Sequence, residues 1–145
     1  MDEGNLKARD GKEIKESAKN TSREILDLLD LKGKATEPGP FTMPCAGYSG
    51  GAYRAHHPWS LYDVPVDEME QAIDRLRKGL PRKGWKIVKD GFDGSPSKAP
   101  QIVANSKDGE ISVDIRLHDE RKYGKDPSLI EVTVESACFK TKNPD

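Results

Sequence analysis

Two stretches near the C-terminus decide the fold: EISVDIRLHD at residues 110–119 and LIEVTVESACF at residues 129–139. In the first, apolar side chains occupy every second position from Ile111 to Leu117, with polar side chains between them. The second repeats this alternation from Ile130 to Val134. A period of two residues is typical of β-strands that bury one face and leave the other in water. Both stretches are therefore predicted to be strands of a half-buried sheet.

Shorter apolar runs predict further strands at residues 59–64, 85–89 and 101–106, and a short extended piece at residues 41–45. Residues 107–109, Lys-Asp-Gly, join the strand at 101–106 to the next one, and an Asp-Gly pair favours a tight hairpin because it tolerates positive φ. Strands joined by tight hairpins run antiparallel. We therefore expect an antiparallel sheet of four to five strands.

One amphipathic helix is predicted at residues 66–80. Its apolar residues recur at intervals of three and four positions, namely Val66, Met69, Ile73, Leu76 and Leu80. Pro65 suits the first turn of a helix, and we expect Gly79 and Pro81 to end it.

A second helix is predicted nearer to the N-terminus, at residues 21–31, with its stop at Gly33. The pairs Asp10–Glu13 and Thr21–Glu24 both have the spacing of a capping box, so the helix has two alternative starts. Within residues 1–31, four of the five leucines lie after Thr21. We therefore expect residues 21–31 to pack and any helical turns before Thr21 to fray. The expected fold class is α+β, a two-layer sandwich in which two helices cover one face of the antiparallel sheet.

Apolar residues are unevenly distributed along the 145-residue chain. Leu, Ile, Val and Phe number 8 in residues 1–58 but 20 in residues 59–139. We therefore expect a mobile N-terminal segment at residues 1–20, a single α+β domain at residues 21–140 and a C-terminal tail at residues 141–145.

The charge balance limits the partners that the protein can have. The chain carries 24 basic and 25 acidic residues, so no excess of one sign exists to attract nucleic acid or a membrane surface. No apolar run approaches the roughly 20 residues that a membrane span needs, and no signal-peptide core is present. We expect a monomer without a cofactor and without a bound metal.

The two cysteines, Cys45 and Cys138, lie in contrasting surroundings. Cys138 continues the inward-facing positions of the last predicted strand, whereas Cys45 lies in a Pro- and Gly-rich segment with few apolar anchors. A disulfide between them would hold that segment against the last strand, and closing a loop of nearly this size stabilises a fold by roughly 4–5 kcal/mol in the chain-entropy model. The alternative is two free cysteines in a reducing cytosol.

Three phrases of the sequence resemble small secreted lipoproteins of actinobacteria, a group without an established activity. They are YRAHHPWSLYDV at residues 53–64, LRKGLPRKGWKIVKDG at residues 76–91 and LIEVTVESACF at residues 129–139. The resemblance implies export, membrane anchoring only through a lipid on an N-terminal cysteine that this chain lacks, and a disulfide between Cys45 and Cys138. It carries over no catalytic residue.

One stretch concentrates polar and aromatic side chains of the types that dominate binding hot spots. Its candidate binding residues are Tyr48, Tyr53, Arg54, His56, His57 and Trp59. The alternative interpretation is an ordinary loop that leads into a strand. His56 and His57 are adjacent, so in an extended chain they point to opposite sides and do not suit a shared metal ion.

Catalysis has little support in the sequence. Ser60, His118 and Asp119 supply the residue types of a hydrolase triad, but the sequence has no nucleophile elbow.

We therefore expect a non-enzymatic extracytoplasmic domain, anchored to the membrane as a lipoprotein or secreted, that binds an unknown protein or a ligand of the cell envelope. The alternatives are a cytosolic adaptor or regulatory module and a small hydrolase-type enzyme.

Overall fold

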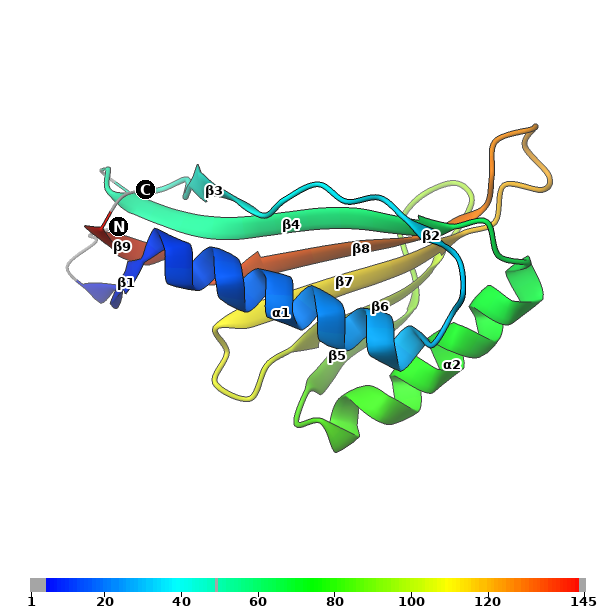
Figure 1. Ribbon diagram of the computed structural model, residues 1–145, viewed down its shortest axis with the longest axis horizontal. Coiled ribbons are helices and arrows are strands. Elements are labelled where there is room, and N and C mark those ends of the chain that lie inside the picture. Colours follow the sequence, from blue (N-terminus) through cyan, green and yellow to red (C-terminus); the bar gives the residue numbers. More distant parts are fainter. Residues whose placement is uncertain (1–4, 49, 144–145) are drawn as a thin grey trace.

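The computed structural model of the protein describes residues 5–48 and 50–143. Within these residues, two helices, α1 (Gly11–Leu29) and α2 (Val66–Arg82), pack against a single sheet (Figure 1). The longer strands are β4 (Ala52–Tyr62), β5 (Lys86–Phe92), β6 (Pro100–Asn105), β7 (Ile111–His118) and β8 (Leu129–Ser136). The shorter strands are β1 (Ala8–Asp10), β2 (Lys34–Ala35), β3 (Phe41–Pro44) and β9 (Phe139–Asn143).

The predicted sheet of four to five antiparallel strands is wrong in both size and pairing. The described residues form a nine-stranded mixed sheet with the order β1-β9-β4-β8-β7-β6-β5, in which β2 and β3 also pair with β4. The mixed character comes from β1 and β9, which run parallel. The short extended piece predicted at residues 41–45 is confirmed as β3, whereas β1, β2 and β9 are only two to five residues long, too short to display an alternating pattern.

Strand β4 is also longer than predicted, because it begins at Ala52 rather than at Trp59. Its first half places Ala55 and His57 on the buried side, and such residues do not stand out as an apolar alternation. The predicted strand at residues 129–139 is in fact two strands, since β8 ends at Ser136 and β9 begins at Phe139. The link between them lets β9 continue along β4 beyond the end of β8.

The alternation that defines the sheet is confirmed. The inward-facing residues of β7 and β8 are buried beneath the helices, namely Val113, Ile115, Leu117, Ile130, Val132 and Val134. The α+β class is confirmed as well, with α1 packed on β4 and β8 and α2 packed on β5, β7 and β8. Trp59, Trp85 and Met69 are also buried in the core.

Helix α1 uses the earlier of its two predicted starts. The side chain of Asp10 accepts a hydrogen bond from the Lys12 backbone N–H at 2.9 Å, and the helix continues without a break through residues 20 and 21. It ends at Asp30, which adopts the left-handed conformation with φ 50°. The predicted start at Thr21 and the predicted stop at Gly33 are therefore wrong.

Gly33 instead permits a close approach between two segments. A Cβ at this position would lie 2.5 Å from the backbone oxygen of Tyr62. The first half of α1, which the sequence analysis assigned to a mobile segment, buries Ile14 and Ala18 against the sheet. Residues 1–4 of that segment, and residues 144–145 of the predicted tail, lie outside the described residues.

Helix α2 runs two residues beyond its predicted end, to Arg82. Pro81 lies in the last turn, where it cannot donate to the carbonyl four residues earlier, and the helix ends one residue later. Gly79 does not stop the helix but lets it approach α1, since a Cβ at that position would lie 2.8 Å from Cδ2 of Leu28. Across the same contact, the Arg75 guanidinium donates to the Leu29 carbonyl at 2.7 and 3.0 Å and so caps the C-terminus of α1.

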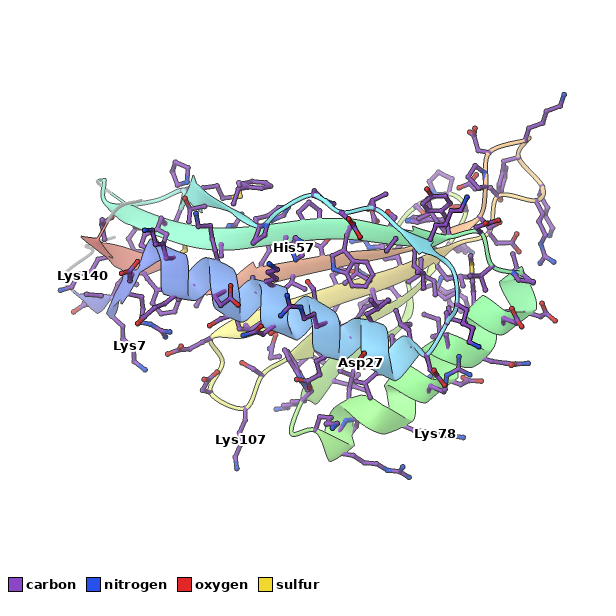
Figure 2. The ribbon with its side chains drawn as sticks, in the orientation of Figure 1. Lys7, Asp27, His57, Lys78, Lys107 and Lys140 are labelled. Carbon is purple, nitrogen blue, oxygen red and sulfur yellow. A yellow bond between two sulfur atoms is a disulfide. The ribbon has the colours of Figure 1, made fainter. Side chains whose placement is uncertain are left out.

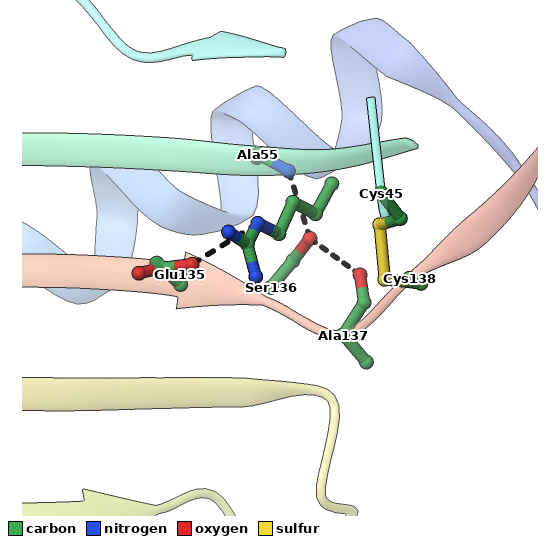
Figure 3. Close-up of a disulfide and its surroundings, with 7 residues drawn as sticks. Cys45, Ala55, Glu135, Ser136, Ala137 and Cys138 are labelled. Carbon is green, nitrogen blue, oxygen red and sulfur yellow. Dashed lines mark hydrogen bonds and ion pairs between the residues drawn. A yellow bond between two sulfur atoms is a disulfide. The ribbon is translucent and has the colours of Figure 1, made fainter. Parts of the chain in front are cut away.

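The predicted disulfide is confirmed. Cys45, directly after β3, is bonded to Cys138 in the link between β8 and β9 (Figure 3), with 6.3 Å between the two Cα atoms. Beside it, the Ser136 hydroxyl accepts from the Ala55 N–H and donates to the Ala137 carbonyl, which satisfies the irregular backbone where β8 ends. The covalent link joins segments 93 residues apart and closes the end of the molecule at which β1 and β9 pair.

Candidate functional site

A groove with a volume of about 400 Å³ lies between α1 and residues 35–40, which we call the 35–40 segment. Its walls are mostly apolar and consist of Leu26, Ala35, Pro38, Pro40 and Trp59. Charged side chains line its rim, namely Lys19 and Arg23 from α1 and Glu37 from the 35–40 segment. This volume falls within the range of small-molecule sites in proteins.

Ser22, His57 and Trp59 form a buried polar network at the floor of the groove, and each has less than 9% of its surface exposed. Ser22 Oγ lies 2.7 Å from His57 Nδ1 and accepts a hydrogen bond of 2.9 Å from Trp59 Nε1. His57 Nε2 lies 2.9 Å from the carbonyl oxygen of Pro38. Figure 2 shows His57 projecting from β4 toward α1.

The hydrogen-bond partners of His57 define the tautomer of its neutral ring. The Pro38 carbonyl can only accept, so His57 Nε2 carries the hydrogen. Nδ1 then accepts the hydroxyl hydrogen of Ser22, whose oxygen accepts from Trp59. Every polar atom of the three side chains is therefore satisfied, which makes the floor of the groove a fixed surface.

The alternation of β4 and the period of α1 bring these residues together. His57 and Trp59 are two positions apart on the strand and so face the same helix. The 35–40 segment is held above them by two hydrogen bonds of 2.9 Å, from the Thr36 N–H to the Ser60 carbonyl and from the Ser60 N–H to the Thr36 hydroxyl. The groove is the space left between these points of attachment and α1.

The contact between Ser22 and His57 also has the form of a nucleophile paired with a general base. Two features limit its chemistry. Ser22 lies in the interior of α1, where its backbone N–H is committed to the helix and is not available to stabilise an oxyanion. The Trp59 indole already donates to the Ser22 oxygen, so the hydroxyl is held in place on both sides.

The predicted binding residues do not share one surface, because β4 divides them between the two faces of the sheet. His57 and Trp59 face α1 and line the groove. Tyr53 also packs against the core, and its hydroxyl donates to the Arg9 carbonyl. Tyr48 lies in the bend after β3 and is half-buried.

Arg54 and His56 lie on the opposite, helix-free face. Arg54 Nε lies 3.1 Å from a carboxylate oxygen of Glu135, and His56 Nδ1 lies 3.5 Å from the other oxygen of the same carboxylate. The His56 ring also stacks obliquely on Phe41, with 5.3 Å between the ring centroids. These contacts make the two residues part of a polar sheet surface rather than of the groove.

The triad composed from Ser60, His118 and Asp119 has no geometric support in the described contacts. Ser60 binds the 35–40 segment through its backbone, His118 Nε2 lies 3.1 Å from Glu131, and Asp119 binds Arg121. Hydrogen bonds from Arg121 hold the pKa of Asp119 below its usual value. In the described part of the chain, no group of three or more His, Cys, Asp or Glu side chains could hold a metal ion.

A buried carboxylate, Asp93, organises the loop between β5 and β6. It accepts hydrogen bonds from the hydroxyl and the N–H of Ser95 and from the Ala99 N–H, and it lies 3.3 Å from the Arg116 guanidinium. These donors, with the Ser95 hydroxyl the most important, lower the pKa of Asp93. The residue belongs to the scaffold and lies away from the groove.

Sequence reasoning found His57 and Trp59 but missed Ser22 and the cations of the rim. A signal for Ser22 was present, since it lies on the buried stripe of α1 between Ala18 and Ile25, where a polar residue needs a buried partner. No pattern in the sequence indicated that the 35–40 segment lies beside α1. It depends on the pairing of β2 and β3 with β4, and those strands are very short.

Comparison with known proteins places the chain in no family: no family model matches it, and neither a curated protein nor a solved structure does. The resemblance to actinobacterial lipoproteins therefore stays a prediction. Neither α1 nor α2 combines the length with the apolar character needed to cross a bilayer, within the residues that the structure describes. The disulfide is compatible with an extracytoplasmic location.

Proposed function

We propose that the protein is an extracytoplasmic binding domain that holds a small, largely apolar molecule in the groove between α1 and the 35–40 segment. The observation that carries this proposal is the groove itself, about 400 Å³ of space with mostly apolar walls above a fixed polar floor. Sites of this composition bind ligands through apolar contact, while a few polar groups set the orientation.

The cellular setting is part of the same proposal. A disulfide in the folded domain suits an oxidising compartment, and the resemblance to secreted lipoproteins implies attachment to the outer face of a membrane by a lipid. A domain in that position would meet its ligand, or an unknown protein partner, at the cell envelope. The balanced charge of the chain gives no support to a nucleic-acid partner.

The groove can be tested with two matched leucines of α1. Leu26 lines the groove, whereas Leu28 lies on the side of the helix that faces α2, and both are half-buried against the core. We expect Leu26→Gln to weaken the binding of octanol or octanoate, measured by calorimetry, by roughly tenfold, because the apolar wall is lost. Leu28→Gln should leave the affinity within about twofold while costing similar stability. Equal affinities of both variants for these probes would contradict the proposal, as would no binding to the unaltered protein.

A second candidate function, a serine hydrolase, is favoured by the 2.7 Å contact between Ser22 Oγ and His57 Nδ1. In that reaction Ser22 Oγ would attack an ester carbonyl while its proton passes to His57, which would return it to the departing alcohol. Water would then release the acid from the acyl-serine. A fluorophosphonate should in that case add to Ser22, as detected by mass spectrometry of the intact protein, and Ser22→Ala should prevent labelling. An unlabelled protein excludes this function and leaves the binding proposal intact.

A further inference from the structure

The charges at the rim of the groove indicate what kind of apolar molecule it takes. Lys19 and Arg23 are four residues apart on α1, so one helical face presents both cations to the groove. Both are exposed, and the Arg23 guanidinium donates to the neutral amide oxygen of Asn20 at 3.5 Å. Among the described residues of the lining, Glu37 is the single acidic one, and it lies on the other wall, in the 35–40 segment.

We infer that the ligand is a monomeric amphiphile with one negatively charged head group, a carboxylate or a phosphate, and a short hydrocarbon chain. This inference rests on the proposed function of the groove. The hydrocarbon tail of the ligand would lie against Leu26, Pro40 and Trp59, and its head group would lie at the α1 side of the rim. Lys19 supplies a compact charge there, and Arg23 supplies a planar group that can bind two oxygens of a carboxylate or a phosphate.

The floor of the groove supports an assignment of the head group to the rim rather than to the interior. His57 has no free hydrogen to offer an anion, because Nε2 donates to the Pro38 carbonyl and Nδ1 accepts from Ser22. The Trp59 N–H is likewise committed to Ser22. A buried charge without a donor would be strongly unfavourable, so the charged end must stay where Lys19 and Arg23 can reach it.

Glu37 determines how much negative charge the groove accepts. Glu37 lines the same groove as the two cations, so the formal charges of these three side chains sum to one net positive charge. A carboxylate, with a single negative charge, cancels this net charge, whereas the second negative charge of a phosphate would meet repulsion from Glu37 and reduce the gain from the two cations. Replacement of Glu37 by Gln should therefore strengthen the binding of a singly charged amphiphile by roughly twofold.

The test is a series of octyl compounds with one chain and different head groups: octanoate, octyl phosphate, octanol and octyltrimethylammonium. We expect octanoate and octyl phosphate to bind more tightly than octanol, and the ammonium compound to bind least well, by calorimetry at low ionic strength. The two anions differ in charge number and shape, so their order reports which head group the rim prefers. Raising the ionic strength from about 0.01 to about 1 M shortens the Debye length from about 30 to about 3 Å, so it should remove most of the advantage of the anions.

A matched pair of double variants assigns the effect to the rim. Lys19→Gln with Arg23→Gln should weaken octanoate binding by roughly fivefold and change octanol binding by less than about twofold. The control is Lys78→Gln with Arg82→Gln, which removes two exposed cations with the same spacing on α2, away from the groove (Figure 2 labels Lys78). This control should leave the affinity for octanoate unchanged.

The outcomes separate the inference from the proposal beneath it. If octanol or the ammonium compound binds as tightly as octanoate, or if the α2 control weakens octanoate binding as much as the α1 double variant, the inference is wrong while the groove remains a binding site. If none of the four compounds binds, the proposed function itself fails and the inference fails with it.

Discussion

Residues 32–51 and the body formed by α2 and β5–β8 are held in place in different ways. The body buries large apolar side chains almost completely, including Met69, Leu80 and Ile115. In residues 32–51, Cys45 alone is buried among the described residues. That segment is held by the short pairings of β2 and β3 with β4, by the disulfide and by the hydrogen bonds of Thr36 and Pro38. The comparison teaches that a segment attached at discrete points can leave a groove between them, whereas an apolar core fills its own space.

The largest expected effect follows from loss of the disulfide. Cys45→Ser combined with Cys138→Ser should lower the free energy of unfolding by about 4 kcal/mol, because the unfolded chain regains the freedom of a long loop. Denaturant unfolding with and without a reducing agent measures the change. If the free energy of unfolding fell by less than about 1 kcal/mol, residues 32–51 would not depend on the covalent link, and the contrast drawn between the two regions would be wrong.

A core truncation in the body should be nearly as costly but should act differently. Leu80→Ala removes a fully buried side chain of α2 and should cost about 3 kcal/mol. We expect it to lower the midpoint of global unfolding without increasing the local exchange of amide hydrogens in the 35–40 segment. Faster exchange confined to that segment would show that the two regions are held together more tightly than the structure indicates.

A smaller effect is expected at the floor of the groove. Ser22→Ala leaves the Trp59 N–H and His57 Nδ1 buried without a partner and should cost about 1–2 kcal/mol in thermal or chemical unfolding. Ser60→Ala is the matched control, because Ser60 binds Thr36 through its backbone and should lose less than about 0.5 kcal/mol. A loss no greater than that of the control would mean that the network does not hold the groove together.

The smallest effect concerns the pH dependence of the body. The lowered pKa of Asp93 means that its ionised form is favoured in the folded state. Its contribution to stability is therefore complete above its unfolded pKa of about 4 and is lost as the pH falls through the lower folded value. The difference in stability between the unaltered protein and Asp93→Asn should be constant near neutral pH and shrink below about pH 4. A difference that is unchanged under acid conditions would contradict the assigned role of this carboxylate.

The sequence predicted the parts of the fold that rest on long periodic patterns. In β7 and β8 the apolar residues alternate over enough positions to identify a strand, and in α2 they recur at helical spacing over enough positions to identify a helix. Short strands such as β2, with two residues, have no period to read, so the sheet was predicted too small. Gly33 and Gly79 were read as stops because the close approaches made there, to the Tyr62 backbone and to the Leu28 side chain, exist only in the folded molecule.

The candidate site was predicted in part for a similar reason. His57 and Trp59 stand out by residue type and lie on the long strand β4, so they could be found from the sequence. The remaining lining comes from α1 and the 35–40 segment, which are brought to β4 by tertiary contacts. Ser22 was recognisable only as a polar interruption of a buried stripe, and its partners could not be identified without the fold.

The central claim, that the groove beside Trp59 is a ligand site, has a direct measurement in the two indole N–H resonances of the ¹⁵N-labelled protein. Trp59 lines the groove and donates to Ser22, whereas Trp85 lies outside it and donates to Glu24 at 3.0 Å. On titration with octanoate, we predict a saturable shift of the Trp59 resonance and an unchanged Trp85 resonance. A shift of Trp85 alone, equal shifts of both, or no shift of either would contradict the claim.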